Sequence, residues 1–166
     1  MDEKRKRGPF LSAAFLCEKV LEEKDGVKSA IRIIDRVTHT AVGPKPPKEM
    51  PPFPYDITLF LRFKSGWARG STDLKIETVK PSGESSTPVQ QTIFFEGEED
   101  RGVDVVGHLR IKLEMTGIYW FHVYLDEEHL TQIPLRVIYM PQIIQERGQG
   151  PSKPFEPDQE TPPESE

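Results

Sequence analysis

Few residues of this chain have the types and spacing that catalysis requires, and its one thiol is the first to consider. Nucleophilic catalysis needs a thiol or hydroxyl group with a base within reach. Cys17 is the only cysteine, and it lies in an apolar segment between Phe15 and Leu21, which predicts a buried core residue. The sequence contains no Gly-x-Ser-x-Gly elbow, phosphate-binding glycine loop or dinucleotide fingerprint. We therefore expect no catalytic residue, no cofactor and no enzyme activity.

Metal binding is the second chemistry to consider. The four histidines are His39, His108, His122 and His129, and no two of them lie two residues apart on one predicted strand. His122 and His108 would meet only across neighbouring strands of suitable register. We predict that these histidines face solvent and that the chain has no metal site.

Carboxylates gather in one predicted loop, residues 96–100, with Asp104 just beyond it. Loops at the end of a β-sandwich hold calcium in some lipid-binding domains, through several oxygen ligands. Neither this loop nor a second acidic turn, residues 126–128, shows a regular alternation of ligands. The sequence favours a solvated acidic turn, and calcium binding stays an alternative.

The most suggestive residues for binding are aromatic. Side chains alternate between the two faces of a predicted strand at residues 118–125. One face carries Tyr119, Phe121, Val123 and Leu125, and the opposite face carries Trp120, His122 and Tyr124. Amphipathic rings in a row on a sheet can form a contact surface for a protein or a ligand. Phe60 is out of phase with its inward-facing neighbours and is predicted to extend this surface. The alternative is that the proline-rich connection, residues 42–54, covers these rings.

These side chains must be positioned by strands, because apolar residues alternate with period two through most of the chain. Residues 55–63 and 109–115 place Ile57, Leu59, Leu61 and Phe63, and Leu109, Ile111, Leu113 and Met115, on one face each. We predict strands at 12–22, 27–38, 55–64, 72–79, 89–95, 103–115, 118–125 and 131–140. The fold class is therefore all-β: a two-layer antiparallel β-sandwich of about eight strands, immunoglobulin-like or C2-like.

The first predicted strand has a competing interpretation, since residues 12–24 also fit a helix. Phe10, Cys17 and Leu21 recur at helical spacing, and Gly26 could serve as the helix C-cap. Against the helix, Asp25-Gly26 suits a two-residue type I′ hairpin turn and is followed by the β-branched residues near Ile33. We favour the hairpin.

Composition divides the 166 residues into one domain and two ends. Residues 1–10 form a basic, flexible arm, residues 11–142 the sandwich, and residues 143–166 an acidic, proline-rich tail that we expect to be disordered. One cysteine excludes an internal disulfide, and no stretch is apolar enough for a signal peptide or a membrane span, which predicts a cytoplasmic protein. The net charge of −5 and the nearly balanced middle do not suggest nucleic-acid binding.

Several segments together resemble a family of small uncharacterised bacterial proteins that are expected to be β-sandwiches. The resemblance rests on residues 15–20, Asp25-Gly26, residues 31–35, residues 117–126 and residues 133–137. It covers about residues 12 to 140 and implies a fold and a bacterial cytoplasmic setting, without an activity. The closing strands are also similar in pattern to those of immunoglobulin-like sandwiches.

We predict from these observations a non-catalytic accessory or adaptor domain that binds another protein. The contact would use Trp120, His122 and Tyr124, or an exposed edge strand, which could also pair two copies in a homodimer. The alternative is a sandwich that binds a carbohydrate or a lipid head group with the same aromatic face and loop carboxylates, with calcium as the ion.

Overall fold

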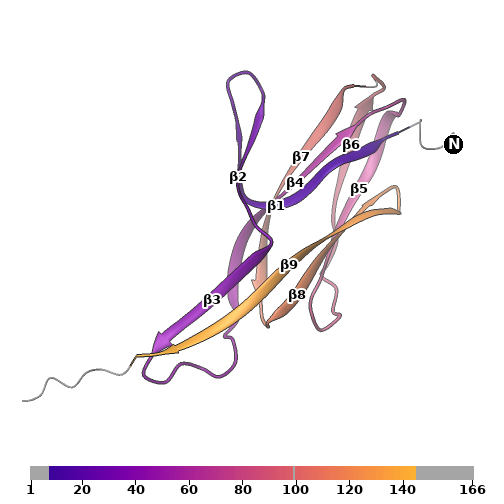
Figure 1. Ribbon diagram of the computed structural model, residues 1–166. Coiled ribbons are helices and arrows are strands. Elements are labelled where there is room, and N and C mark those ends of the chain that lie inside the picture. Colours follow the sequence, from indigo (N-terminus) through magenta and orange to yellow (C-terminus); the bar gives the residue numbers. More distant parts are fainter. Residues whose placement is uncertain (1–7, 99, 145–166) are drawn as a thin grey trace, which may run out of the picture.

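The computed structural model describes residues 8–98 and 100–144, and this part of the chain folds into nine β-strands (Figure 1). The strands are β1 (Phe10–Glu22), β2 (Lys28–Ile33), β3 (Arg36–Gly43), β4 (Phe53–Lys64), β5 (Arg69–Val79), β6 (Val89–Glu96), β7 (Gly102–Leu113), β8 (Gly117–Leu125) and β9 (Glu128–Ile143). No helix long and apolar enough to cross a membrane occurs among the described residues.

Two sheets face each other across one hydrophobic core. The four-stranded sheet has the order β2-β1-β4-β7, the five-stranded sheet has the order β3-β9-β8-β5-β6, and one of the two curls as a half-barrel. The predicted inward rows form the core: Ile57, Leu59, Leu61 and Phe63 from β4, and Tyr119, Phe121, Val123 and Leu125 from β8, are all buried. The prediction of an all-β, two-layer fold is therefore confirmed.

The predicted strand at 27–38 is wrong, because the chain changes sheets in its middle. The amide N of Ile34 donates to the Leu16 carbonyl in the four-stranded sheet (2.8 Å), and the Asp35 carbonyl accepts from the Arg136 amide in the other (2.9 Å). Adjacent residues thus bond to opposite layers, and β2 and β3 are separate strands. Ile33 and Ile34 precede the break and Val37 follows it, so β-branched residues on both sides favour a strand and do not show that the chain changes sheets between them.

The prediction of a purely antiparallel fold is also wrong, because β3 pairs with β9 in parallel. The register joins Arg36 to Arg136 and Gly43 to Ile143. Hairpins force neighbouring strands to run antiparallel, but β3 arrives from the other sheet, so no turn sets its direction relative to β9. Side chains alternate in the same way in parallel and in antiparallel strands, so their pattern does not predict the direction of pairing.

Residues 12–24 belong to a hairpin and not to a helix, as favoured from the sequence. The turn is longer than predicted: the Gly26 amide donates to the Glu23 carbonyl (2.9 Å), and the Glu23 amide donates to the Val27 carbonyl (2.8 Å). Only Gly26 within this turn has a positive φ, of 82°, whereas a type I′ turn needs two such residues. The predicted type I′ turn is therefore wrong, although the glycine is used for its left-handed backbone.

A true two-residue turn joins β8 to β9, where Leu125 pairs with Glu128 across Asp126 and Glu127. Both turn residues have positive φ, 46° and 67°. A non-glycine residue in this region is strained by roughly 1 kcal/mol. Glu127→Gly should therefore raise the free energy of unfolding by about 0.5–1 kcal/mol, because Asp-Gly is a preferred type I′ pair. Urea unfolding measures this, and an unchanged or lower midpoint contradicts it.

The ends and the proline-rich connection complete the fold. Most of the predicted N-terminal arm and C-terminal tail lies outside the described residues, although β1 already begins at Phe10 and β9 ends only at Ile143. The connection from β3 to β4 packs through Met50, which is buried, and its Pro47 carbonyl accepts a hydrogen bond from the Tyr139 hydroxyl (2.6 Å). It thus lies beside β9, and the face that carries Trp120 is elsewhere.

Candidate functional site

The structure brings three of the four predicted contact residues together. Trp120, His122 and Tyr124 lie half-buried on the outer face of the five-stranded sheet, in β8 between β5 and β9. Phe60 lies in β4 of the other sheet, is 5% exposed, and stacks on Phe15 with a ring-centroid distance of 5.1 Å. The expectation that Phe60 extends the patch is wrong, because alternation assigns a face within a strand but does not say which sheet the strand joins.

The aromatic face includes two residues that the sequence did not assign to it, Lys75 and His129. The Lys75 ammonium lies 4.4 Å from the Tyr124 ring centroid, and His129 meets the same ring edge-on at 5.1 Å. His129 Nε2 is also 3.1 Å from His122 Nδ1, so one imidazole donates a hydrogen bond to the other. Cross-strand register places these pairs, and β8 alone gave no signal for them. The side chains of His122, Tyr124 and His129 therefore contact one another, and less of their ring surface is free to contact a ligand.

The approach of His122 to His108 that a metal site would have needed does not occur. His108 is in β7 of the opposite sheet, where its Nδ1 lies 3.3 Å from the Thr58 hydroxyl. His122 instead shares a hydrogen bond with His129, which lies opposite Tyr124 in the β8–β9 hairpin. Within the described residues no three histidine, cysteine, aspartate or glutamate side chains are grouped so that they could hold a metal ion.

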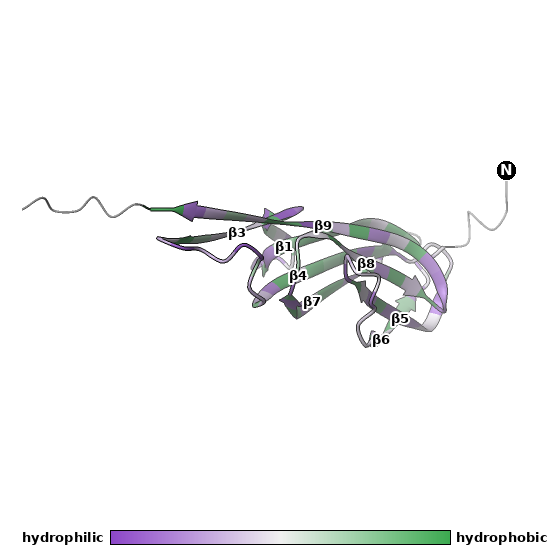
Figure 2. Cartoon of the chain, turned by 90° about the horizontal axis from the view of Figure 1, so that it is seen from below, coloured by the Kyte–Doolittle hydropathy of each residue, from purple (hydrophilic) through white to green (hydrophobic). Residues whose placement is uncertain are grey.

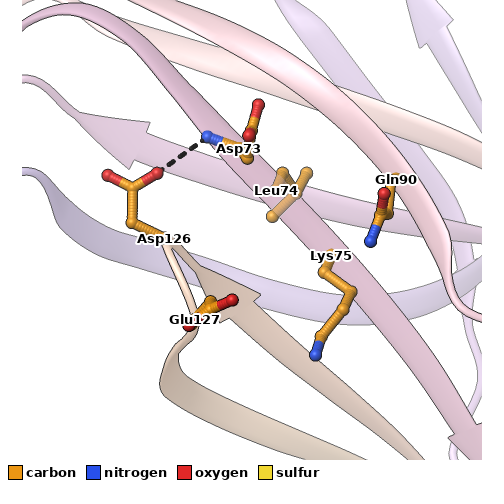
Figure 3. A pocket seen from close by; sticks show the side chains of 6 residues that line it. All are labelled: Asp73, Leu74, Lys75, Gln90, Asp126 and Glu127. Carbon is orange, nitrogen blue, oxygen red and sulfur yellow. Dashed lines mark hydrogen bonds between the residues drawn. The ribbon is translucent and has the colours of Figure 1, made fainter.

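A polar hollow of about 380 Å³ lies beside the aromatic face, at the β8–β9 turn (Figure 3). Its carboxylates already serve the fold. Asp126 Oδ1 accepts from the Asp73 amide (3.0 Å), and Asp73 Oδ1 accepts from the Thr92 hydroxyl (3.0 Å). These bonds tie the turn to β5 and β6, and they leave Lys75 and Glu127 as the charged groups that line the hollow without such a bond.

The acidic loop that raised the calcium alternative is held by arginines. Glu96 and Glu98 both form ion pairs with Arg101, the second at 2.8 Å. Asp104 receives two hydrogen bonds from the Arg62 guanidinium, at 2.7 and 2.8 Å, which lower the pKa of its carboxyl group. A carboxylate with a bound guanidinium has fewer free oxygen lone pairs for a cation.

Cys17 is fully buried, as predicted. Burial raises the pKa of its thiol above the ordinary value and so disfavours the reactive thiolate. Its neighbours in the register, Thr58 of β4 and Ile33 of β2, place it in the middle of the four-stranded sheet. The residue therefore acts as a small apolar side chain in the packing of this layer.

The second candidate site is an arm that projects from the body formed by the two sheets (Figure 2). We call this arm the β3–β9 arm; it consists of β3 and of residues 138–143 of β9. The antiparallel pairing of β8 with β9 ends at Gly117 opposite Val137, so this last part of β9 has β3 as its strand neighbour. Large apolar side chains are exposed near its tip: Val42 (55%), Met140 (49%), Ile143 (72%) and Ile144 (53%).

The hydrogen-bond pattern shows which backbone groups of the arm are free. The Asp35 and Gly43 carbonyls accept from the Arg136 and Ile144 amides (2.9 and 3.1 Å). Since consecutive residues of a strand point their backbone groups to opposite sides, odd-numbered residues of β3 face β9. The groups of Arg36, Thr38, Thr40 and Val42 face outward, and no backbone hydrogen bond from them to another described residue is present.

The two edges of the arm differ in protection. On β9 the outward-facing groups belong to odd residues, and Pro141 among them has no N–H to offer to an added strand. On β3 the outward-facing stretch contains no proline and has one charge, Arg36, at its start. Edge strands usually carry charges, prolines or bulges that prevent pairing with another chain. The β3 edge is therefore open to an additional strand.

The remaining edge strands are better protected than β3. Arg32, near the end of β2, has a positive φ of 52°, and its pairing with Glu18 is the one position missing from the β1–β2 ladder. Edge strand β7 has an alternating charged row, in which Arg110 is paired with Asp56 and Lys112 with Glu114. Strand β6 lies next to β7, where the edges of the two sheets approach each other. The free edge of β3 is thus the clearest place for a partner strand.

Comparison with known proteins places this architecture in a family. Residues 12–138 match the model of a family described as "Family of unknown function (DUF6941)". The match covers well over half of the chain. No curated protein sequence matches the chain.

Proposed function

Since this chain belongs to that family of unknown function, we propose its role from geometry: a non-catalytic β-sandwich that binds another protein through the β3–β9 arm. The single observation that carries the proposal is the arm itself. A two-stranded ribbon is marginally stable in water, and this one exposes apolar side chains at its tip and an unpaired edge on β3. A protein strand added to β3 satisfies the free backbone groups and covers the apolar tip.

We also propose that the sandwich is immunoglobulin-like. The order β9-β8-β5-β6 corresponds to strands G, F, C and C′ of variable-type immunoglobulin domains, and β1-β4-β7 to A, B and E. Tyr119, near the start of β8, accepts hydrogen bonds from the amides of Glu114 (2.9 Å) and Met115 (3.2 Å). This contact has the form of the tyrosine corner that links strands E and F in that fold. Immunoglobulin-like sandwiches commonly serve as binding modules, which agrees with the proposed role.

The aromatic face supports a binding role less well than the arm does. Lys75 lies over the Tyr124 ring and His129 over its edge, so a sugar ring that stacked there would first displace a charged side chain. The carboxylates of the acidic loop are paired with arginines, which weakens the calcium-dependent alternative. A bacterial cytoplasmic location and the lack of nucleic-acid binding stay predictions from the sequence.

Photo-crosslinking in growing bacteria tests the proposed function. A photoreactive amino acid replaces Val42 at the arm in one full-length variant, Lys112 on the charged β7 edge in a control, and Trp120 in a third. We expect a dominant protein adduct from position 42 only, identified by mass spectrometry, which disappears when Thr40→Pro is added. Proline removes an outward N–H of β3 and leaves the bonds to β9 intact.

Each other outcome of this experiment contradicts the proposal. A dominant adduct from position 120 and none from position 42 moves the contact to the aromatic face. Equal adducts from positions 42 and 112 show that the arm has no preference for a partner. An adduct that survives Thr40→Pro shows that the β3 edge does not make the contact. Circular dichroism of the purified variants verifies that all of them keep the strand content of the unmodified protein.

A further inference from the structure

The arm is complementary to itself, and we propose that its partner is a second copy of this chain. Two β3 strands pair antiparallel about a two-fold axis, so that the two five-stranded sheets join into one continuous sheet. This inference rests on the proposed function, because it names the partner of the same β3 edge. Closed two-fold pairing is the commonest form of protein homo-oligomer.

The free backbone groups of β3 fix one best register. Those of Arg36, Thr38, Thr40 and Val42 all point outward. Only outward-facing residues can exchange both hydrogen bonds with a residue of the second strand. Antiparallel pairing that uses all four places Arg36 opposite Val42 of the second copy, and Thr38 opposite Thr40. Every other register leaves at least one outward residue without a partner.

Side chains agree with this register. Threonines opposite each other on neighbouring strands form a favourable cross-strand pair, and Thr38 and Thr40 are both exposed on the same face. Arg36, the one charge in β3, faces a valine and not a second arginine. The two-fold axis passes beside His39. The His39 ring stacks on Phe53 and on Tyr139 of its own chain, with ring-centroid distances of 4.3 Å and 5.9 Å. These contacts hold the ring away from the strand edge.

Charge at the two ends of the arm favours the antiparallel direction. At the base, Arg36 and Arg136 are register partners and both are exposed, and neither forms an ion pair with another described residue. At the tip, the chain continues from Ile144 into residues 145–166, which contain six acidic and two basic residues. Antiparallel pairing keeps the arginines of the two copies at opposite ends of the joined arms, and it brings Ile144, after which this acidic stretch of sequence begins, beside the base of the other copy.

The exposed apolar side chains at the two ends of the arm also favour antiparallel pairing. Ile33, just before the base of the arm, is 66% exposed, and Val42 and Ile143 at the tip are 55% and 72% exposed. Antiparallel pairing places the tip of each copy next to Ile33 of the other, and water is removed from both groups. Parallel pairing would place tip beside tip and base beside base, with the arginines together.

The first test is the oligomeric state of the purified full chain. Sedimentation velocity measures it at a series of micromolar concentrations. We expect a monomer–dimer equilibrium. Thr40→Pro removes two hydrogen bonds from the symmetric interface and should weaken dimerisation by about ten- to a hundredfold. Thr40→Val, which keeps the N–H and the strand preference, is the matched control and should dimerise like the unmodified chain. A monomer at all concentrations overturns the inference.

The register is tested by disulfide formation between two variants, Thr38→Cys and Thr40→Cys. Residues directly opposite in the proposed register have Cα atoms about 5.5 Å apart, within disulfide range. Identical positions are diagonal neighbours at about 7–8 Å, beyond that range. Under mild oxidation the equimolar mixture should therefore give a covalent dimer, and each variant alone should not. Native Cys17 is buried and does not compete.

The outcomes separate this inference from the proposed function. Covalent dimer from one variant alone, or none from a mixture that still sediments as a dimer, shows another register and overturns the proposed one. A monomeric protein whose arm crosslinks in cells to a different protein overturns self-pairing and leaves the proposed function standing. A monomeric protein with no arm adduct overturns both.

Discussion

Phe63→Ala should lower the free energy of unfolding by about 3–5 kcal/mol, the usual cost of removing a large aromatic ring from a core. Phe63 is fully buried in β4, and its ring meets Phe95 of β6 edge-on, with centroids 6.1 Å apart and planes at 81°. The pair joins the two sheets, so the substitution loses buried area, the ring–ring contact and the packing between layers. Denaturant unfolding followed by circular dichroism measures the change.

Phe94→Ala is the matched control for that prediction. Phe94 precedes Phe95 on the same strand, but it is 61% exposed. Removal of its ring should change stability by less than about 0.5 kcal/mol, as is usual for surface positions. Equal losses for the two variants would show that β6 does not present Phe95 to the core, and the assignment of the two faces of this strand would be wrong.

Tyr119→Phe should cost about 1–3 kcal/mol although it removes one oxygen atom. The Tyr119 hydroxyl accepts from the amides of Glu114 and Met115 and donates to the Met115 carbonyl (3.3 Å), and the Tyr119 side chain is 1% exposed. Phenylalanine fills the same space but leaves these backbone groups without a partner. Unsatisfied polar groups of this kind are expensive when they are shielded from water.

Tyr124→Phe provides the comparison, because Tyr124 lies on the same strand with its ring on the outer face. Its hydroxyl forms no hydrogen bond with another described residue, so its removal should change the denaturation midpoint little. If both variants lost the same stability, the cost would come from the β8 strand in general and the corner assignment would fail. Backbone amide exchange adds a local readout: only Tyr119→Phe should speed exchange at residues 114 and 115.

Only part of the aromatic face could be predicted from the sequence. Trp120, His122 and Tyr124 share a face because they alternate along one strand, and a period of two is visible in any strand of this length. Lys75 and His129 complete the same cluster from β5 and from β9. Cross-strand neighbours depend on register, which is set by turns and by packing across the core, so one strand's pattern cannot name them.

The β3–β9 arm was not predicted, and its absence from the prediction has a definite cause. β-Branched residues lie both before and after the break within residues 27–38, so the sequence predicts one strand there. The crossing between sheets at Ile34 and Asp35 comes from competition between two sets of backbone partners far apart in the chain. The sequence predicted an edge-strand contact only as a general possibility of a sandwich, and this contact stays a prediction. The strand order then shows which edges the two sheets have.

By itself the sequence determined the all-β class, the inward rows of β4 and β8 and the burial of Cys17, because burial of alternate side chains is a local property of an extended chain. Only the tertiary structure decided the change of sheet before β3, its parallel pairing with β9, the separation of Phe60 from Trp120 and the free β3 edge. These features depend on which distant strand supplies each backbone hydrogen bond. Because the backbone N–H and C=O groups are the same in every residue except proline, the side chains of one strand do not specify its hydrogen-bonding partner.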